Sequence, residues 1–483
     1  MKTRKRILAA VLAGAMAAAS LAGCGGNVSS QTGASNTASA NTASSAASPS
    51  GTGTTGDGKL LLASAELPAK AKFPVSDQYF DRKSGEYDRE QYKKDSEVWN
   101  AARSEREALA AAAKNGYNDF LTDLSKLMLA DKSIDNPAFS PLNIYISLGM
   151  LAEVSEGETR AQILKAAHAG SLDGLYETAN ALARAARRED DAQTVTLGGS
   201  LWLADRIPFS EAVVKKTAER YFSSIYHGKF GTEAMDQALR DWLNEKTGGL
   251  LRNQVNDLKF DDPNLAMVLA ATIYLKAVWA DEFSEKETED AVFHGKAGDK
   301  EVPFMKKSDM GTVYYGGKFS AIRKEFVSGG GMYLILPNEG VSPEELLDDA
   351  EAKRFVTGEA ASWKNTKNAL VHLSMPKYDV TSEYDLRAIL RQMGIVDAFD
   401  SNKANFSSLT TDGTPLFVNK AMHDARVKVN EHGVEAAAFT VYMLAEGAAL
   451  PDEEVDFTLD RPFLYVVEGD TGIPLFVGAV NKL

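Results

Sequence analysis

The sequence predicts a protein of mixed α and β structure in which one large domain follows an N-terminal leader. Apolar residues recur at helical spacing over 120–128, which indicates a helix. Residues 265–279 form an apolar run with a single charge, Lys276, which is typical of a deeply buried strand. From about residue 115 onward no Pro/Ser-rich linker interrupts such patterns. We therefore expect one continuous domain over 115–483 rather than two ordinary ones.

The composition argues against several classes of function. Of the 483 residues 67 are acidic and 53 are basic, and a formal net charge of −14 makes a nucleic-acid-binding surface improbable. One cysteine and six histidines leave no material for an intramolecular disulfide and little for a metal centre. Neither a Walker loop nor an H-E-x-x-H motif nor a nucleophile elbow occurs in the sequence. We expect no cofactor, no metal and no enzymatic activity.

The first 23 residues have the pattern of an export signal. Four positive charges lie within residues 2–6, and the uncharged apolar stretch at 7–19 is shorter than the ~20 residues of a membrane-spanning helix. The signal ends in Leu21-Ala-Gly-Cys24, which resembles the lipobox of bacterial lipoproteins. That resemblance implies cleavage before Cys24, lipidation of Cys24 and anchoring to the outer face of a bacterial cell membrane. An ordinary secretory signal with an incidental cysteine is the alternative.

Two further segments precede the domain. Residues 24–58 are almost entirely Ser, Thr, Ala, Gly and Asn after the cysteine. Such a segment cannot bury enough apolar surface to offset its ordering entropy, which predicts a flexible tether. Residues 59–114 are mixed and charged, with interspersed aromatic residues such as Tyr79 and Trp99. We expect them to form an N-terminal extension that packs partly on the main domain.

Two fragments of the domain match an enzyme signature in an unsuitable context. Ser374-Met-Pro-Lys377 fits the S-x-x-K of penicillin-binding proteins, and Lys246-Thr-Gly248 fits their K-T-G. That chemistry needs the serine at the start of a helix, whereas Pro376 interrupts the turn and the flanking sequence is strand-like. The K-T-G also precedes the serine instead of following it. A cell-wall-acting serine hydrolase is therefore a disfavoured alternative.

The most unusual local feature is a small-residue segment that follows a predicted strand at 425–431. Residues 431–440 read Glu-His-Gly-Val-Glu-Ala-Ala-Ala-Phe-Thr. At a period of two, one face of the segment is small and uncharged, with Val434, Ala436 and Ala438. The other face carries Glu435, Ala437 and Phe439. The pattern suits a half-buried strand as well as an exposed loop, and an Ala-rich helix or long hairpin arm is the alternative.

Here the sequence resembles the serpin family, over residues 115–483. Glu431-His-Gly433-Val-Glu435-Ala-Ala-Ala is similar to the serpin proximal hinge, E-E-G-T-E-A-A-A. Eight further motifs agree with the family in type and order: Asn136-Pro-Ala-Phe-Ser140-Pro141, Gly157-Glu-Thr-Arg-Ala-Gln-Ile163, Trp242 with Thr247 and Gly249, Ile273-Tyr-Leu-Lys-Ala-Val-Trp279, Pro376-Lys-Tyr378, His423-Asp-Ala425, Asp460-Arg-Pro-Phe-Leu464 and Leu475-Phe-Val-Gly478. Each motif alone is weak, but eight in order make the resemblance specific.

The resemblance implies an α+β fold with a large, mostly antiparallel central sheet, additional sheets, about eight or nine helices and an exposed reactive-centre loop. It also implies a suicide-substrate inhibitor of serine proteases. The protease cuts the loop, forms an acyl-enzyme and is trapped when the loop inserts into the central sheet as a new strand. The hinge of that movement would consist of Glu431, Gly433, Val434, Glu435, Ala436, Ala437 and Ala438.

The same resemblance assigns four residues to the region where the sheet parts: Asn136, Ser140, His423 and Trp279. Trp279 would lie at the end of the sheet where insertion starts, and the other three near its centre. Two positions depart from the family pattern. Ala271-Thr272 stands where Asn-Ala is usual, and Asn143 where a serine is common. These departures change the expected hydrogen bonds at the sheet centre but not the expected fold.

Two counts along the chain bracket the reactive bond. Family spacing from Glu431 places the residue before the cut at Gly447, and spacing back from Phe457 places it at Ala448 or Ala449. All three side chains are small and suit a narrow primary pocket, so we expect an elastase-like or subtilisin-like target. No Arg or Lys lies between residues 431 and 461, which argues against trypsin-like proteases.

Two alternatives stay open at this point. A cut at Leu444 or Met443 would indicate a chymotrypsin-like target. A non-inhibitory serpin that acts as a binding module is the principal alternative function, although the small residues of the hinge argue against it. We expect a monomer whose partners are the target serine protease and, through Cys24, a membrane.

Overall fold

The computed structural model describes residues 60–67, 71–81, 83–252, 255–256, 258–260, 262–357, 360–435 and 453–483. The predicted signal peptide and the predicted tether with Cys24 lie outside the described residues. So do three of the hinge residues and the candidates for the reactive bond: Ala436, Ala437, Ala438, Gly447, Ala448 and Ala449.

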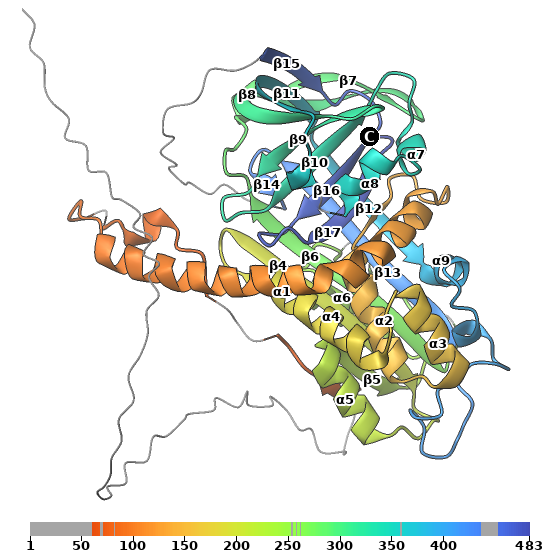
Figure 1. Ribbon diagram of the computed structural model, residues 1–483. Helices are drawn as coiled ribbons and strands as arrows, with labels where there is room; N and C mark the ends of the chain where they lie inside the picture. Colours follow the sequence, from red (N-terminus) through yellow and green to blue (C-terminus); the bar gives the residue numbers. More distant parts are fainter. Residues whose placement is uncertain are drawn as a thin grey trace, which may run out of the picture. The chain divides into compact units, whose positions relative to one another are not determined.

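A central sheet of eight strands carries the described fold (Figure 1). Its strands follow one another in the order β1 (Leu61–Ser64), β5 (Ser224–Gly228), β4 (Gln193–Ala204), β6 (Met267–Val278), β14 (Gly433–Val434), β13 (Val418–Asn430) and β12 (Tyr378–Asp385), and β3 (Arg188–Glu189) pairs with β4. The β4–β5 and β6–β13 pairs are parallel, and the other pairs are antiparallel. This is the mostly antiparallel sheet that the serpin resemblance predicts.

A second sheet of nine strands completes the β structure. Its order is β15 (Glu453–Thr458), β11 (Thr366–Pro376), β8 (Gly298–Tyr315), β9 (Phe319–Glu325), β10 (Gly331–Pro337), β16 (Phe463–Glu468), β17 (Pro474–Val480) and β2 (Ala138–Phe139), and β7 (Glu289–Gly295) pairs with β8. Every residue of β10, β16 and β17 is buried, which explains why these segments read as continuous apolar runs rather than as alternating ones.

Nine α-helices lie in the described part of the chain, within the expected range: α1 (Arg89–Leu129), α2 (Pro141–Glu153), α3 (Gly157–Ala166), α4 (Leu172–Ala186), α5 (Glu211–Tyr221), α6 (Glu233–Lys246), α7 (Pro343–Leu346), α8 (Ala350–Val356) and α9 (Leu386–Gln392). All residues of α2 are buried. Its start is fixed by Ser140, whose hydroxyl accepts a hydrogen bond from the amide of Asn143, and by proline at the first helical position.

Two neighbouring glycines of β4 show which helix covers which face of the central sheet. A β-carbon at Gly198 would lie 3.1 Å from the side chain of Lys246 in α6, and one at Gly199 would lie 2.8 Å from the sulfur of Met150 in α2. Successive residues of a strand point to opposite faces. Helices α6 and α2 therefore cover opposite faces of the sheet, and a β-carbon at either glycine would require the facing side chain to shift.

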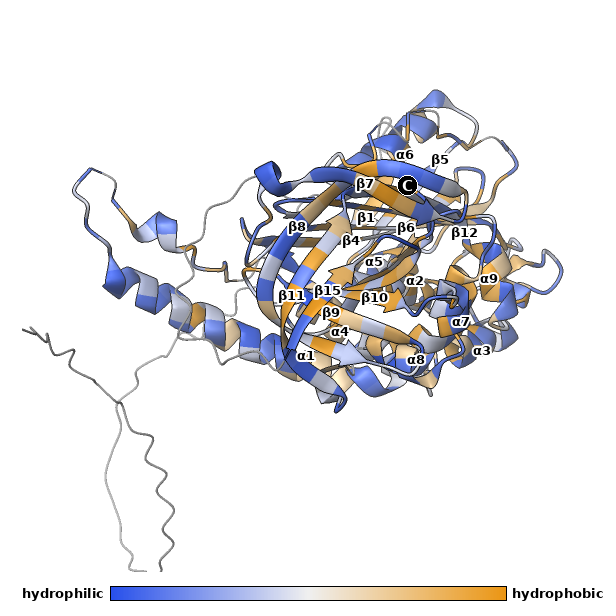
Figure 2. Cartoon of the chain, turned by 90° about the horizontal axis from the view of Figure 1, so that it is seen from above, coloured by the Kyte–Doolittle hydropathy of each residue, from blue (hydrophilic) through white to orange (hydrophobic). Residues whose placement is uncertain are grey.

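The N-terminal extension is built into this fold. Strand β1 pairs antiparallel with β5 and adds an edge to the central sheet. Helix α1 begins within the extension and continues without a break past residues 114 and 115, where we expected the domain to begin. Its N-terminal half is mostly hydrophilic in Figure 2, yet Trp99 and Arg106 are buried. The extension thus packs on the domain through the β1–β5 ladder and through buried side chains that include Trp99 and Arg106.

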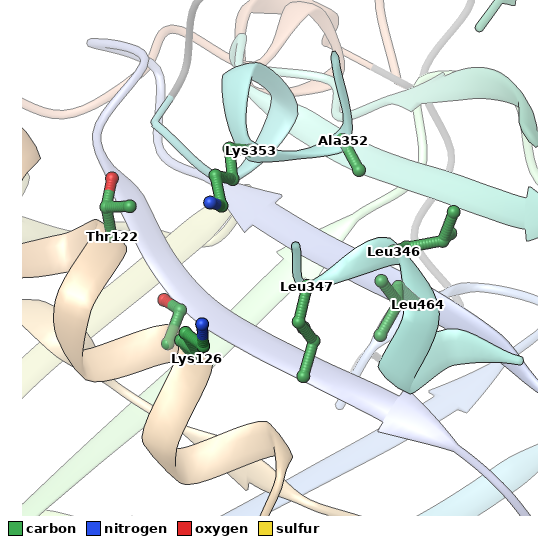
Figure 3. A pocket seen from close by; sticks show the side chains of 8 residues that line it. Thr122, Lys126, Leu346, Leu347, Ala352, Lys353 and Leu464 are labelled. Atoms are coloured by element: carbon green, nitrogen blue, oxygen red, sulfur yellow. The ribbon is translucent and has the colours of Figure 1, made fainter. Parts of the chain in front are cut away.

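A small hollow lies where α1, the α7–α8 segment and β16 meet (Figure 3). Its walls are mainly apolar, with Leu346, Leu347 and Leu464, while Lys126 at its edge pairs with Asp348 at 2.6 Å. The hollow belongs to the packing of α1 on the second sheet and is formed by none of the strands of the central sheet.

Candidate functional site at the open end of the central sheet

The hinge segment enters the central sheet at one end. Strand β14 pairs antiparallel with β13 on one side and with β6 on the other. Further along, β6 and β13 pair directly with each other, up to Asp424 opposite Thr272. Val434 of β14 is 2% exposed, so its side chain already belongs to the core. The sheet is therefore open by the width of one strand at the β14 end and closed at the other.

A tight turn formed by the chain itself directs β14 into this opening. The side-chain oxygen of Asn430 accepts hydrogen bonds from the amides of His432 (3.0 Å) and Gly433 (3.1 Å). An asparagine that binds the backbone two residues ahead stabilises such turns, and the glycine leaves the hairpin unhindered. The chain thus reverses at Asn430-Glu-His-Gly433, and β14 pairs with the end of β13.

Glu431 anchors the turn to both sheets. Its carboxylate accepts hydrogen bonds from Lys377 at 3.0 Å, which follows β11, and from the hydroxyl of Thr288 at 2.9 Å. Its carbonyl accepts the amide of Phe283 at 2.9 Å. Burial alone would raise the pKa of Glu431, but the hydrogen bond and charge of Lys377, together with Thr288, lower it below its ordinary value. The carboxylate is therefore charged and held in place.

Trp279 lies directly after β6 at the same open end. Its indole Nε1 donates to the carbonyl of Asn430 at 3.0 Å, and its amide donates to the carbonyl of His432 at 2.9 Å. The indole stacks on Phe326, with ring centres 5.0 Å apart and planes at 16°. The indole thus fastens the end of β6 to the hinge turn and to the neighbouring sheet.

His432 faces carboxylates with both ring nitrogens. Its Nδ1 lies 2.7 Å from Glu282 and its Nε2 lies 3.5 Å from Glu285. Both glutamates belong to the segment between β6 and β7, so the turn is held from this side as well.

The closed part of the sheet is joined to helix α2 through His423 of β13. The imidazole Nε2 accepts the amide of Ser140 at 2.9 Å, so the ring proton of the neutral imidazole is carried by Nδ1. Complete burial lowers the pKa of His423 from 6.5 to about 4, and the Ala271 backbone offsets this only in part. The imidazole is therefore neutral at pH 7 and acts as a structural hydrogen-bond acceptor.

The two departures from the family pattern meet at the point where the sheet parts. Thr272 donates its hydroxyl to the carbonyl of Asp424 at 3.1 Å and so fastens the last direct β6–β13 pair. The side-chain nitrogen Nδ2 of Asn143 in α2 donates hydrogen bonds to the carbonyls of Gly198 at 3.0 Å and Thr272 at 2.5 Å. This helix therefore holds the parting point from below through an asparagine.

Asn136 has a different set of contacts. Its side-chain oxygen accepts the amides of Asn481 and Lys482 at 2.8 and 3.0 Å, and its side-chain nitrogen donates to the carbonyl of Lys482. Its own carbonyl accepts the hydroxyl of Ser382 in β12. The side chain thus fixes the C-terminal residues and does not join Ser140 and His423 in their hydrogen bond.

The enzyme-like fragments are part of the framework. Ser374 is an extended residue of β11, which pairs with β8 on one side and β15 on the other. Lys377 forms an ion pair with Glu431. Lys246-Thr-Gly248 forms the end of α6. Ser308 lies 2.8 Å from His372, but Glu454 is 3.8 Å from that histidine and all three belong to strands that pair with one another. Their neighbouring backbone amides serve the ladder rather than an oxyanion hole.

Sequence reasoning missed the partners of the hinge. Lys377, Thr288 and Phe326 hold Glu431 and Trp279 in place, but none was expected to do so. Pro376-Lys-Tyr378 was the one available signal, and it marked a family motif rather than a contact. In the described ranges no group of three or more His, Cys, Asp or Glu side chains is placed to hold a metal, and no helix is both long and apolar enough to cross a membrane.

The central sheet is thus open at one end, where β14 lies between β6 and β13. A family model described as "Serpin (serine protease inhibitor)" matches residues 115–483, so the chain belongs to the serpin family. Curated relatives agree with this assignment. Alpha-1-antitrypsin of Meriones unguiculatus is 29% identical over 377 residues, which cover 75% of this chain and 88% of that protein. The plasma serine protease inhibitor of Bos taurus is 27% identical over 381 residues, covering 77% and 91%.

Solved structures show the same fold. The thermophilic serpin tengpin in its native state has a TM-score of 0.66 and 24% identity, covering 76% of this chain and 93% of tengpin. Native protease nexin-1 with heparin has a TM-score of 0.66 and 22% identity, covering 78% and 100%. The α+β fold predicted from the sequence, the serpin fold, is confirmed.

Proposed function

We propose that this serpin is an irreversible suicide-substrate inhibitor of serine proteases, most suited to elastase-like or subtilisin-like enzymes. The protease serine attacks the carbonyl of the reactive bond, the bond to the leaving amine breaks, and an acyl-enzyme forms. The freed loop then enters the central sheet as a new strand and pulls the acylated protease with it before water cleaves the ester.

The observation that carries this proposal is the position of β14 between β6 and β13. Beyond β14, residues 273–276 of β6 and 425–427 of β13 have no strand partner on the sides that face each other, among the pairings described. A strand continuing from β14 would add ladder hydrogen bonds on both sides and bury one face. Only small, uncharged side chains suit that face, and Ala436 and Ala438 share the parity of the buried Val434.

The target class is inferred from the loop sequence. The side chains of Gly447, Ala448 and Ala449 are at most a methyl group. A narrow primary pocket accepts such a side chain, whereas a deep pocket would be poorly filled by it. The segment 432–460 holds no Arg or Lys to pair with an acidic pocket. Leu444 and Met443 keep a chymotrypsin-like target as the second choice within this proposal.

The sequence of the leader supports an exported protein that is lipid-anchored through Cys24. An anchor at Cys24 would hold the exported domain at the outer face of the membrane, exposed to the extracellular space. We also propose a monomer that has no catalytic activity of its own, because a single-use trap needs neither a second copy nor turnover.

The test is reaction of the purified protein with elastase, subtilisin and trypsin, followed by denaturing electrophoresis and mass spectrometry of the released peptide. We expect an SDS-stable complex with elastase or subtilisin, none with trypsin, and a cut within 447–450. A stable trypsin complex, or clean cleavage by elastase without a complex, contradicts the proposal. The second outcome is the one that a non-inhibitory serpin would give.

Two matched variants test insertion at the same loop. Ala436→Arg places a charge on the face that must be buried, whereas Ala437→Arg places it on the opposite face. We expect the first variant to be cleaved as a substrate without forming a complex, and the second to keep most complex formation. Equal behaviour of the two variants would contradict insertion in this register.

The anchor is tested separately. In a bacterial host that processes lipoproteins, Cys24→Ala should move the protein from the membrane fraction to the soluble exported fraction. Incorporation of labelled palmitate should be lost at the same time. Retention of the variant in the membrane fraction would contradict lipidation at Cys24.

A further inference from the structure

Glu435, the residue that follows β14, has an unusual backbone conformation. Three non-glycine residues in the described chain have positive φ: His168 (52°), Phe222 (50°) and Glu435 (51°). His168 and Phe222 end helices α3 and α5, where a left-handed residue is a common way to stop. Glu435 follows a strand, and no helix end accounts for its conformation.

The left-handed region is unfavourable for a residue with a β-carbon, because the β-carbon approaches the following carbonyl oxygen. Such residues adopt it where the surrounding structure imposes it, and they concentrate at functional sites. The amide of Glu435 still donates to the carbonyl of Lys428 in β13 at 2.8 Å. The residue is thus held in the ladder by its amide while its backbone departs from the extended form.

The side chain of Glu435 is also placed unfavourably. Its Oε2 is buried and makes no hydrogen bond in the structure described. The nearby Arg426 is already paired with Asp379, with both contacts at 2.6 Å. Loss of solvent raises the pKa of the Glu435 carboxyl, and the charges of Lys428 and Arg426 only partly oppose this. Backbone and side chain are both strained at the residue where the inserted strand stops.

We propose that Glu435 is the positioning residue that arrests the partly inserted hinge and stores strain for its further insertion. This inference rests on the proposed function and adds a role for one residue of the same site. As the strand lengthens, Glu435 becomes extended and its side chain turns to the face opposite Val434, toward solvent. The left-handed strain and the buried, unpaired oxygen are both removed in that step.

The alternative is that Glu435 is only an ordinary turn residue. Its Gly and Val variants would then rank in the same order in the intact and the cleaved forms. Glycine and asparagine tolerate the left-handed region, whereas a β-branched residue avoids it and prefers a strand. If Glu435 arrests the hinge, Glu435→Gly should stabilise the intact form and disfavour the inserted form, and Glu435→Val should do the opposite.

The experiment compares thermal midpoints of the intact and the loop-cleaved full-length protein at one scan rate, for wild type, Glu435→Gly, Glu435→Asn and Glu435→Val. In the intact form we expect the thermal midpoints of Glu435→Gly and Glu435→Asn to lie above that of the wild type and the midpoint of Glu435→Val to lie below it. The expected shifts are about 1–3 °C. In the cleaved form we expect Gly below wild type and Val at or above it. The rate at which heating converts intact protein to an inserted form should rise about tenfold for Val and fall about tenfold for Gly.

Three further variants separate the causes of such shifts: Glu301→Gly, Glu301→Val and Glu435→Gln. Glu301 serves as the matched control, because it is an exposed glutamate with an extended backbone in β8, which is not a strand of the central sheet. Its Gly and Val variants should shift the intact and cleaved forms alike. Glu435→Gln keeps the β-carbon and removes the charge, and we expect it to stabilise the intact form less than Glu435→Gly does. A Gln effect equal to that of Gly would contradict the backbone part of the proposal.

The proposal is overturned if the Gly and Val variants rank in the same order in the intact and cleaved forms. Failure of the proposed function would look different. In that case cleavage would not raise the midpoint of the wild type, although the intact forms would still rank Gly above Glu above Val.

Discussion

His423 acts at the residue scale as a neutral hydrogen-bond acceptor that joins the central sheet to helix α2. It is completely buried, and its Nε2 accepts the amide of Ser140 at 2.9 Å. Protonation would remove this acceptor and place a charge in the core at the same time. The imidazole is therefore suited to fastening α2 under the sheet only while it carries no charge.

This requirement predicts a loss of stability in mild acid. The unfolded chain binds a proton at His423 near pH 6.5, whereas the folded protein binds it only near pH 4. Because the folded-state pKa is the lower one, the stability is fully present above pH 6.5 and is lost as the pH falls toward 4. Chemical unfolding of wild type and His423→Gln between pH 7.5 and 4 should show a steeper fall for wild type. Equal slopes for wild type and His423→Gln would contradict the prediction.

The contact between Glu431 and Lys377 predicts a non-additive pair. Lys377→Met leaves the buried Glu431 carboxylate with Thr288 as its remaining side-chain partner, which should cost about 2 kcal/mol of unfolding free energy. The double variant Lys377→Met, Glu431→Gln no longer carries the uncompensated Glu431 charge, so most of the lost unfolding free energy should be recovered. A double-mutant cycle measured by denaturant unfolding gives the coupling energy. Additive losses would show that the pair contributes nothing specific.

The sequence identified several residues of this site but not their contacts. The family motifs pointed to Ser140, His423 and Trp279 because their residue types stand in a recognisable order. The pairing of Glu431 with Lys377 and Thr288 spans 54 and 143 residues of chain, and only the assembled sheets bring them together. Asn136, which was assigned to the same region, binds the C-terminal residues, whose position depends on the fold in the same way.

At the scale of elements, α1 is attached to the domain by a buried group of four charged side chains. Asp470 in the β16–β17 turn pairs with Arg106 of α1 and, at 2.7 Å, with Arg188 of β3. Arg188 also pairs with Asp190 at 2.6 Å. These side chains are at most 3% exposed, and their charges balance. Such a group fixes how elements meet even where its net contribution to stability is small.

Removing one member of this group is predicted to be costly. Asp470→Asn removes the carboxylate that Arg106 and Arg188 share, while Asp190 still pairs with Arg188. The change should lower the unfolding free energy by about 3 kcal/mol. Asp348→Asn breaks an exposed pair with Lys126 on the same helix and serves as the control. We expect the control to unfold like the wild type. If both variants unfold alike in denaturant, the buried group does not hold α1 in place.

The limits of the sequence pattern are clearest in α1 itself. Helical spacing over 120–128 predicted its C-terminal half, which lies in the core. Its N-terminal half carries alternating charges and few apolar residues, and its position is set by Trp99 between Arg103 and Arg188 and by the buried Arg106. A periodicity argument detects an apolar face, so it does not detect a helix held by aromatic and charged contacts.

At the scale of the whole molecule, the central sheet combines a closed part and an open part. The closed part is fastened by α2 through Ser140 and Asn143, and the open part by Glu431 and Trp279. A further strand between β6 and β13 would have to separate their direct pairs up to Asp424 and replace them on both sides. The balance between these contacts and the new ladder determines whether the protein works as a trap.

The central claim is that the loop becomes a strand of the central sheet, and amide hydrogen exchange tests it most directly. The exchange of residues 435–446 is followed by mass spectrometry before and after reaction with elastase. We predict that these amides exchange about a hundredfold more slowly after the reaction, because they then belong to the ladder between β6 and β13. Unchanged exchange in a protein whose loop has been cut would contradict insertion and with it the proposed mechanism.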